Sequence, residues 1–163
     1  MLSEPKIIER PTQPIIFIAL EVSQPEIAEV GPPLPDEVAA WAKAHGVALA
    51  GAPFFDYCAF LPGGRMKMRV GFPVTAPAVA SGRVMAGELL GGRYASLTHT
   101  GPYHELYEAN MTLDAWVRQE GEDFAGAVEG ECFVDATRLE IYHKDPGEDP
   151  SGHPVTEVAF RLK

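Results

Sequence analysis

The sequence repeats itself, and this repetition limits the possible folds more than any other feature of the chain. Residues 40–46 (AWAKAHG) align with residues 115–121 (AWVRQEG), and residues 70–72 (VGF) align with residues 158–160 (VAF) in the same order. The first pair lies in segments with helical spacing of apolar residues, and the second pair lies in strand-like segments. We therefore predict two copies of one structural unit, divided near residues 76–78.

Each predicted unit has the order strand, strand, helix, strand, strand, because runs rich in β-branched and aromatic residues flank one helical pattern in each half. Repeat one covers about residues 6–75 and repeat two about residues 82–163. Pro25, Pro32 and Pro33 predict a loop before the first helix. The expected strands are residues 7–10, 15–22, 56–61 and 66–74, then 83–90 and 93–98 as a hairpin, then 138–144 and 155–162, with helices at about 35–45 and 100–120.

This pattern predicts an α+β fold with pseudo-two-fold symmetry, antiparallel sheets and one long helix per repeat. Each unit has a helix on one sheet face only, so its uncovered face needs a partner, and the other copy is the obvious one. We expect a single domain over residues 1–163 with a groove between the halves. The two repeats take up this whole length, so no helix-turn-helix segment is expected.

The charge balance argues against direct contact with nucleic acid. The chain has 23 acidic and 13 basic residues, a formal net charge of −10, which repels phosphate backbones. The apolar run at residues 15–20 is too short to cross a bilayer, and the first residues do not resemble a secretory signal. With only two cysteines and no paired spacing, we expect a cytoplasmic protein without a metal or other cofactor.

One predicted strand carries the most informative polar residue. Between positions 138 and 144, Arg138, Glu140 and Tyr142 should share one face of the strand, whereas Leu139 and Ile141 should enter a core on the other. A carboxylate among apolar residues is costly to bury without a partner. Glu140 is therefore expected either to lie in water or to await a partner.

Several motifs occur in a fixed order, mostly in the second half of the chain. They are Gly92-Arg93-Tyr94-Ala95, His99-Thr100-Gly101-Pro102-Tyr103, Trp116 with Gly121, Glu140-x-Tyr142-x-x-Asp145-Pro146, and Thr156-Glu157-Val158. This series resembles that of one known family, the GyrI-like domain, which also serves as the effector-binding module of AraC-type and MerR-type transcription activators. The resemblance covers nearly the whole chain, and it is strongest from residue 82 to residue 162.

The resemblance implies a stand-alone domain with an internal duplication of the SHS2 type and a groove between its halves. In the family this groove takes bulky aromatic or amphipathic molecules, often cations, and a strand glutamate meets the positive charge. Glu140 occupies the matching position, with Tyr142 beside it. The sequence departs from the family pattern at Leu139, where an aromatic residue is usual. Asp56 is a candidate for a second carboxylate in the groove.

Aromatic side chains are the expected companions of this carboxylate, since their faces attract cations. For both tryptophans, packing of the helices is the alternative role. For Glu140, the alternative is a surface acid paired with Arg138 or Lys144. The predicted ligand-binding residues are Glu140, Tyr142, Tyr103, Tyr94, Trp116, Trp41, Tyr57 and Phe55.

Three functions remain open at this point. The first is binding of a small hydrophobic, aromatic or cationic molecule without direct binding to nucleic acid or membrane. The second is hydrolysis of small strained electrophiles, which some relatives of this fold carry out, with Glu140 as general base and Tyr142 nearby. The third is a gyrase-inhibitor-like role in which the acidic surface binds a protein partner.

Overall fold

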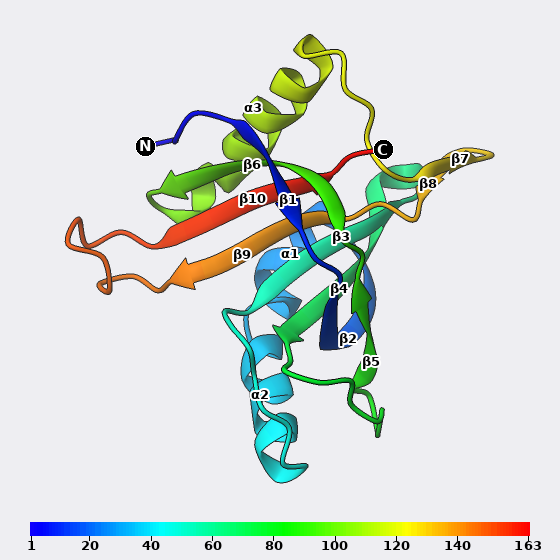
Figure 1. Ribbon diagram of the computed structural model, residues 1–163, viewed down its shortest axis with the longest axis vertical. Helices are drawn as coiled ribbons and strands as arrows, with labels where there is room; N and C mark the ends of the chain where they lie inside the picture. Colours follow the sequence, from blue (N-terminus) through cyan, green and yellow to red (C-terminus); the bar gives the residue numbers. More distant parts are fainter.

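The computed structural model describes residues 1–163 and has an α+β fold built on one curled antiparallel sheet (Figure 1). Along the main path of the sheet the strands follow the order β1-β6-β10-β9-β3-β4-β2-β5. The strands are β1 (Lys6–Arg10), β2 (Gln13–Ser23), β3 (Phe54–Phe60), β4 (Arg65–Pro73), β5 (Met85–Leu89), β6 (Gly92–Thr100), β9 (Arg138–Lys144) and β10 (Val155–Arg161), with the small pair β7 (Ala127–Glu129) and β8 (Cys132–Val134) beside β3.

The two halves of the chain join edge to edge. Strand β3 of the first half pairs with β9 of the second, and Phe55 lies opposite Glu140. At each end of the sheet, the outermost strand is the first strand of one half. It is followed inward by the second, fourth and third strands of the other half. The motifs of residues 70–72 and 158–160 lie in β4 and β10, which are third from the two ends. The predicted duplication remains an interpretation of this order.

The predicted hairpin of residues 83–98 is wrong. Strands β5 and β6 do not pair with each other, since β5 pairs with β2, whereas β6 pairs with β1 and β10. The link from β5 to β6 crosses the link from β1 to β2, where the backbone N–H of Gly91 donates to Thr12 Oγ1 (2.9 Å). A Cβ on Gly91 would overlap the backbone of this neighbouring link, so only glycine allows so close a crossing.

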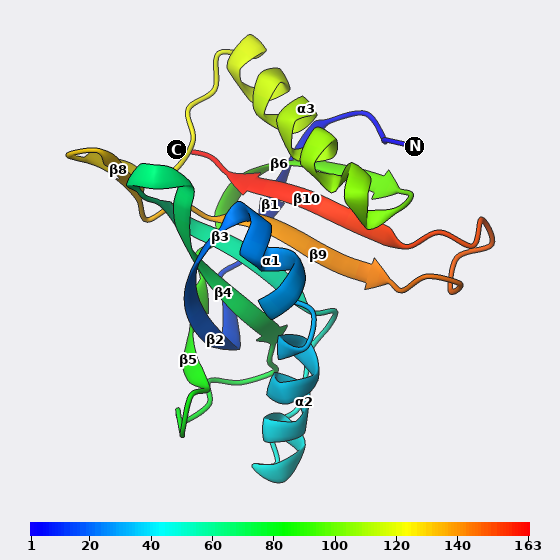
Figure 2. The same cartoon turned by 180° about the vertical axis from the view of Figure 1, so that it is seen from behind.

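Three helices and the short 3₁₀ turn η2 lie over one face of the sheet, whereas the 3₁₀ turn η1 connects β3 to β4. Figure 2 shows α3 at the top of the view, α1 in front of the middle strands β3 and β4, and α2 at the bottom. Because the helices stand apart over the two halves, the middle of the sheet is left between them. The elements are α1 (Gln24–Val30), α2 (Leu34–Ala44), α3 (Leu106–Gln119) and the 3₁₀ turns η1 (Pro62–Gly64) and η2 (Tyr103–Glu105).

Three apolar clusters hold these layers together. Val38 and Ala42 of α2 pack on the first half of the sheet, and Leu113 and Val117 of α3 pack on the second. The third cluster lies on the helix-free face, where curling of the sheet brings the two halves together, as predicted for the uncovered faces. It contains Ile15, Phe17, Phe54, Leu89, Tyr94, Leu139 and Ala159.

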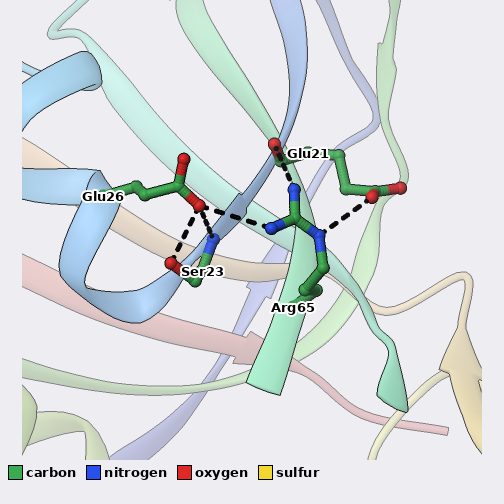
Figure 3. Close-up of polar contacts among 4 residues, drawn as sticks. All are labelled: Glu21, Ser23, Glu26 and Arg65. Atoms are coloured by element: carbon green, nitrogen blue, oxygen red, sulfur yellow. Dashed lines mark hydrogen bonds and ion pairs between the residues drawn. The ribbon is translucent and has the colours of Figure 1, made fainter. Parts of the chain in front are cut away.

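Residues 24–30 form helix α1, although the prolines of this region predicted a loop. Pro25 lies in the first turn, where its missing N–H has no helical partner to lose. Glu26 Oε1 accepts hydrogen bonds from the backbone N–H of Ser23 (2.9 Å) and from its hydroxyl (2.8 Å). Arg65 of β4 reaches both Glu26 and Glu21 of β2 (Figure 3). The cap and this arginine fix the start of α1 over the sheet.

None of the helices is long and apolar enough to cross a membrane.

Candidate functional site

A cavity of about 940 Å³ lies between the helices of the two halves, over the middle of the sheet. Its floor is formed by β3 and β9, with α1 and the start of α2 on one side and η2 and α3 on the other. More than half of the residues that line it are hydrophobic. A volume of this size is at the upper end of the range typical of small-molecule sites, roughly 300–1,000 Å³.

Glu140 lies in the floor of this cavity and is 6% exposed. The hydroxyls of Tyr57 (2.9 Å) and Tyr142 (2.8 Å) both donate to its Oε1, and the amide of Asn110 donates to its Oε2 (2.9 Å). It takes part in none of the ion pairs of the protein, although eleven are formed elsewhere. The carboxylate is thus held by neutral donors alone, and it keeps acceptor capacity for a further partner.

The two phenols remain donors over the physiological pH range. Burial, and then the nearby Glu140 carboxylate, raise the pKa of Tyr57 above its usual range. The same two causes, together with Tyr57 itself, raise the pKa of Tyr142. Loss of either proton would place a second negative charge beside Glu140, so both tyrosines stay neutral and hold the carboxylate in one orientation.

The lining of the cavity carries excess negative charge. Its carboxylates are Asp36, Asp114, Glu140 and Asp145, and its one guanidinium is that of Arg138. Arg138 Nη1 donates to Asp114 Oδ2 (3.1 Å), which neutralises that pair. The remaining carboxylates make the cavity attractive to a cation, as in any cleft lined by charges of one sign.

Five of the eight predicted binding residues line this cavity. Besides Glu140, they include Tyr142, whose ring meets those of Phe55 (5.1 Å between centroids) and Tyr103 (5.9 Å) edge to face. Tyr57 completes the set, and Tyr103 at the rim is 43% exposed. These rings come from β3, β9 and η2, so the cavity presents aromatic surface from both halves of the chain.

The other three predicted residues lie outside the cavity. Tyr94 is fully buried on the helix-free face, and its hydroxyl donates to the carbonyl of Leu90 (2.5 Å), because its position in β6 turns it away from the helices. Trp41 stacks on His45 (4.2 Å) and packs on the core of the first half, and Trp116 packs on that of the second. Both tryptophans therefore pack their helices against the core, which was the predicted alternative to ligand binding.

Asp56 is not a second carboxylate of the groove. It neighbours Tyr57 in β3, so strand alternation directs it to the opposite face, where it is fully buried. Arg69 donates to its Oδ2 through Nε (3.0 Å) and Nη2 (2.8 Å), and the backbone N–H of Arg138 donates to its Oδ1. Burial nevertheless raises the pKa of Asp56 to about 6, with Arg69 opposing the shift.

Leu139, where the family pattern has an aromatic residue, lies on the same helix-free face as Asp56. It is 2% exposed and packs in the cluster shared by the two halves. Its side chain is therefore separated by the sheet from the Glu140 carboxylate.

Two features of the site were not predicted from the sequence, namely the role of Asn110 and the pairing of Arg138 with Asp114. Asn110 lies one turn after Leu106 on α3, and its amide bridges the carbonyl of Leu106 (2.8 Å) and Glu140. A polar amide inside a helix, next to the apolar stripe, was the only local signal. No group of three or more His, Cys, Asp or Glu side chains is arranged to hold a metal ion.

Comparison with known proteins gives the same picture of the fold. The C-terminal domain of EcmrR has a TM-score of 0.74 at 18% identity, covering 98% of this chain and 97% of that domain. In the EcmrR–DNA complex the score is 0.77 at 18% identity, with 98% of this chain covered, but the chain spans only 57% of that longer protein. No curated protein sequence matches the chain.

Two further solved structures share the fold. SAV2435 bound to tetraphenylphosphonium has a TM-score of 0.64 at 13% identity, over 99% of this chain and 94% of that one. A hydrolase from Listeria innocua has a TM-score of 0.57 at 13% identity, over 98% and 92% of the two chains. Residues 3–163 match the GyrI-like small molecule binding domain. The chain therefore belongs to the family of GyrI-like small molecule binding domains.

Proposed function

We propose that the protein binds an aromatic cation in the cavity between its halves, with Glu140 facing the positive charge. The observation that carries this proposal is a buried carboxylate that has three neutral donors and no cationic partner. Removing a carboxylate from water is costly, and neutral hydrogen bonds return only part of its solvation. A ligand cation supplies the missing charge.

The aromatic lining supports the same class of ligand. Phe55, Tyr57, Tyr103 and Tyr142 surround the carboxylate, and a cation over such a ring gains about 0.5–2 kcal/mol, depending on how far it is desolvated. The similarity to SAV2435, whose structure contains the aromatic cation tetraphenylphosphonium, agrees with this chemistry.

A matched pair of ligands tests the role of charge. An N-butyl styrylpyridinium dye carries the cation, and the stilbene in which carbon replaces the charged ring nitrogen has the same shape without it. We expect Glu140→Gln to weaken binding of the dye at least about tenfold, or about 1.4 kcal/mol, while affinity for the stilbene changes less than about twofold. Dye fluorescence and titration calorimetry measure both affinities.

Glu108→Gln is the control, because it removes one exposed carboxylate from α3 outside the cavity. It should leave both affinities unchanged. Unchanged stilbene binding by Glu140→Gln also demonstrates that this variant keeps its cavity. Equal losses for the two ligands, or no loss for the dye, would contradict charge recognition by Glu140.

Hydrolysis in the same cavity is a second candidate, favoured by the two phenols within hydrogen-bonding distance of Glu140. The fold similarity to the hydrolase from Listeria innocua gives it a structural precedent. Turnover of an epoxide or another strained electrophile that disappears in Glu140→Gln would support this second function over binding alone.

A further inference from the structure

A second cavity adjoins the first at Arg138. It has a volume of about 470 Å³ and lies at the end of the groove toward α3 and the C-terminus. Phe60, Asp114 and Arg138 line both cavities. The guanidinium of Arg138 thus stands at the junction, where an elongated ligand in the main cavity would reach it.

Arg138 is held in place but is poorly supplied with hydrogen-bond acceptors. Its guanidinium carbon lies over the rings of Phe124 (4.2 Å), Phe160 (4.9 Å) and Phe60 (5.2 Å). Its side chain donates one hydrogen bond, to Asp114, and its buried Nε has no partner. A guanidinium has five N–H donors, so most of its capacity is unused.

The pKa of Arg138 has the direction expected for a cation short of solvation. Burial lowers this pKa, and the Asp114 carboxylate opposes the shift without cancelling it. Asp114 is also shared, because Arg118 Nε donates to its other oxygen (2.7 Å). A second acceptor at Arg138 would therefore relieve a real deficit.

The balance of charge changes along the groove. Glu140 and Asp145 lie toward the C-terminal end of β9 in the main cavity, whereas three basic and two acidic residues line the second cavity. The second cavity is therefore less acidic than the main one. The cationic side chains are Arg118, Arg138 and Lys163, and the carboxylates are Asp114 and Asp123.

We propose that Arg138 is a second recognition point of the groove and binds an oxygen acceptor, best a carboxylate, on the same ligand whose cation faces Glu140. This inference rests on the proposed function. Arg138 and Glu140 are two residues apart on one face of β9, about 6.6 Å along the strand. The ligand class is thus an aromatic cation that carries a carboxylate a few bonds away. A planar guanidinium matches such a group with two parallel hydrogen bonds.

Two dyes that differ at one group test this second point. The N-butyl styrylpyridinium is compared with the N-carboxypropyl dye, in which a carboxylate replaces the terminal methyl. The measured quantity is the ratio of their dissociation constants, butyl over carboxypropyl. We expect this ratio to fall at least about fivefold in Arg138→Met, whose unbranched side chain still fills the space among the three phenylalanines.

Asp114→Asn supplies a change in the opposite direction. It removes the carboxylate that competes for Arg138, so the ratio should rise above that of the unmodified protein. A ratio that is unchanged in Arg138→Met, or that falls in Asp114→Asn, would overturn the inference. If the proposed function itself is wrong, the result is different: the N-butyl dye does not bind, or its affinity does not change in Glu140→Gln.

Discussion

At the scale of single residues, the position of Glu140 followed from strand alternation, but its surroundings did not. Residues two apart share a face, so Arg138, Glu140 and Tyr142 line the cavity while Leu139 is buried behind them. Besides its neighbour Tyr142, the donors to the carboxylate are Tyr57, 83 residues away, and Asn110, 30 residues away. No local pattern specifies such distant partners.

A third buried carboxylate, Glu157, connects several strands on the helix-free side. From β10 it accepts hydrogen bonds from Arg10 of β1 and from Ser96 of β6 (2.7 Å), and it lies 2.9 Å from His143 Nε2 of β9. Burial alone would raise its pKa, but the hydrogen bonds from His143, Arg10 and Ser96 outweigh burial and lower the pKa to about 2.

This shift predicts a dependence of stability on pH. Because the pKa of Glu157 is lower in the folded than in the unfolded chain, its stabilising contribution is present above about pH 4.5 and is lost as pH falls toward about 2. We expect Glu157→Gln to lower the free energy of unfolding at neutral pH by roughly 1–3 kcal/mol. The difference from the unmodified protein should shrink in urea titrations at progressively lower pH. A difference that stays constant with pH would contradict this origin.

At the scale of elements, β4 and β10 have corresponding places in the sheet but differ at one residue. Gly71 of β4 faces the backbone of β2 so closely that a Cβ would overlap the carbonyl oxygen of Ile16. Ala159 at the aligned position of β10 is fully buried and fits without such a contact. At the middle position of the aligned motifs Val-Gly-Phe and Val-Ala-Phe, a Cβ therefore has room in β10 but not in β4.

We expect Gly71→Ala to destabilise the protein by roughly 3 kcal/mol or more, because the clash is with backbone that belongs to the β2–β4 pairing and cannot move alone. Thermal and urea unfolding measure the loss. Gly51→Ala is the matched control, since its Cβ would lie 3.3 Å from the side chain of Pro73 at an exposed position. Equal stability of the two variants would show that β2 and β4 can separate slightly without loss.

At the scale of the whole molecule, the two halves are interdependent. Pairing of β3 with β9 makes the sheet continuous, and the first strand of each half pairs with the second strand of the other. The cluster on the helix-free face draws Phe17 and Phe54 from one half and Tyr94 and Leu139 from the other. Unfolding of one half would remove strand partners and apolar contacts from the other, so we expect one cooperative transition.

The two tryptophans report on the two halves separately. Trp41 lies on α2 of the first half and Trp116 on α3 of the second. In Trp116→Phe only Trp41 remains, and in Trp41→Phe only Trp116 remains. Urea unfolding followed by fluorescence should give each variant the same midpoint as its own circular dichroism transition. Separate midpoints for fluorescence and circular dichroism within one variant would mean that the halves unfold independently.

The sequence by itself determined most of the elements, the α+β class and the side of β9 that carries Glu140. These properties are local, because apolar periodicity and strand alternation act over a few residues. Even here local chemistry can mislead. Pro25, Pro32 and Pro33 predicted a loop, whereas the contacts of Glu26 with Ser23 and Arg65 support a helix that ends at Val30.

Only the tertiary structure decided which strands pair and which side chains meet in the cavity. The exchange of first strands between the halves, and the separation of Tyr94 from the cavity by the sheet, depend on how the curled sheet closes. Asn110 and Asp114 approach β9 because α3 packs across the second half of the sheet. Such contacts join residues far apart in the chain, and their free energy arises from packing and burial that no short stretch of sequence contains.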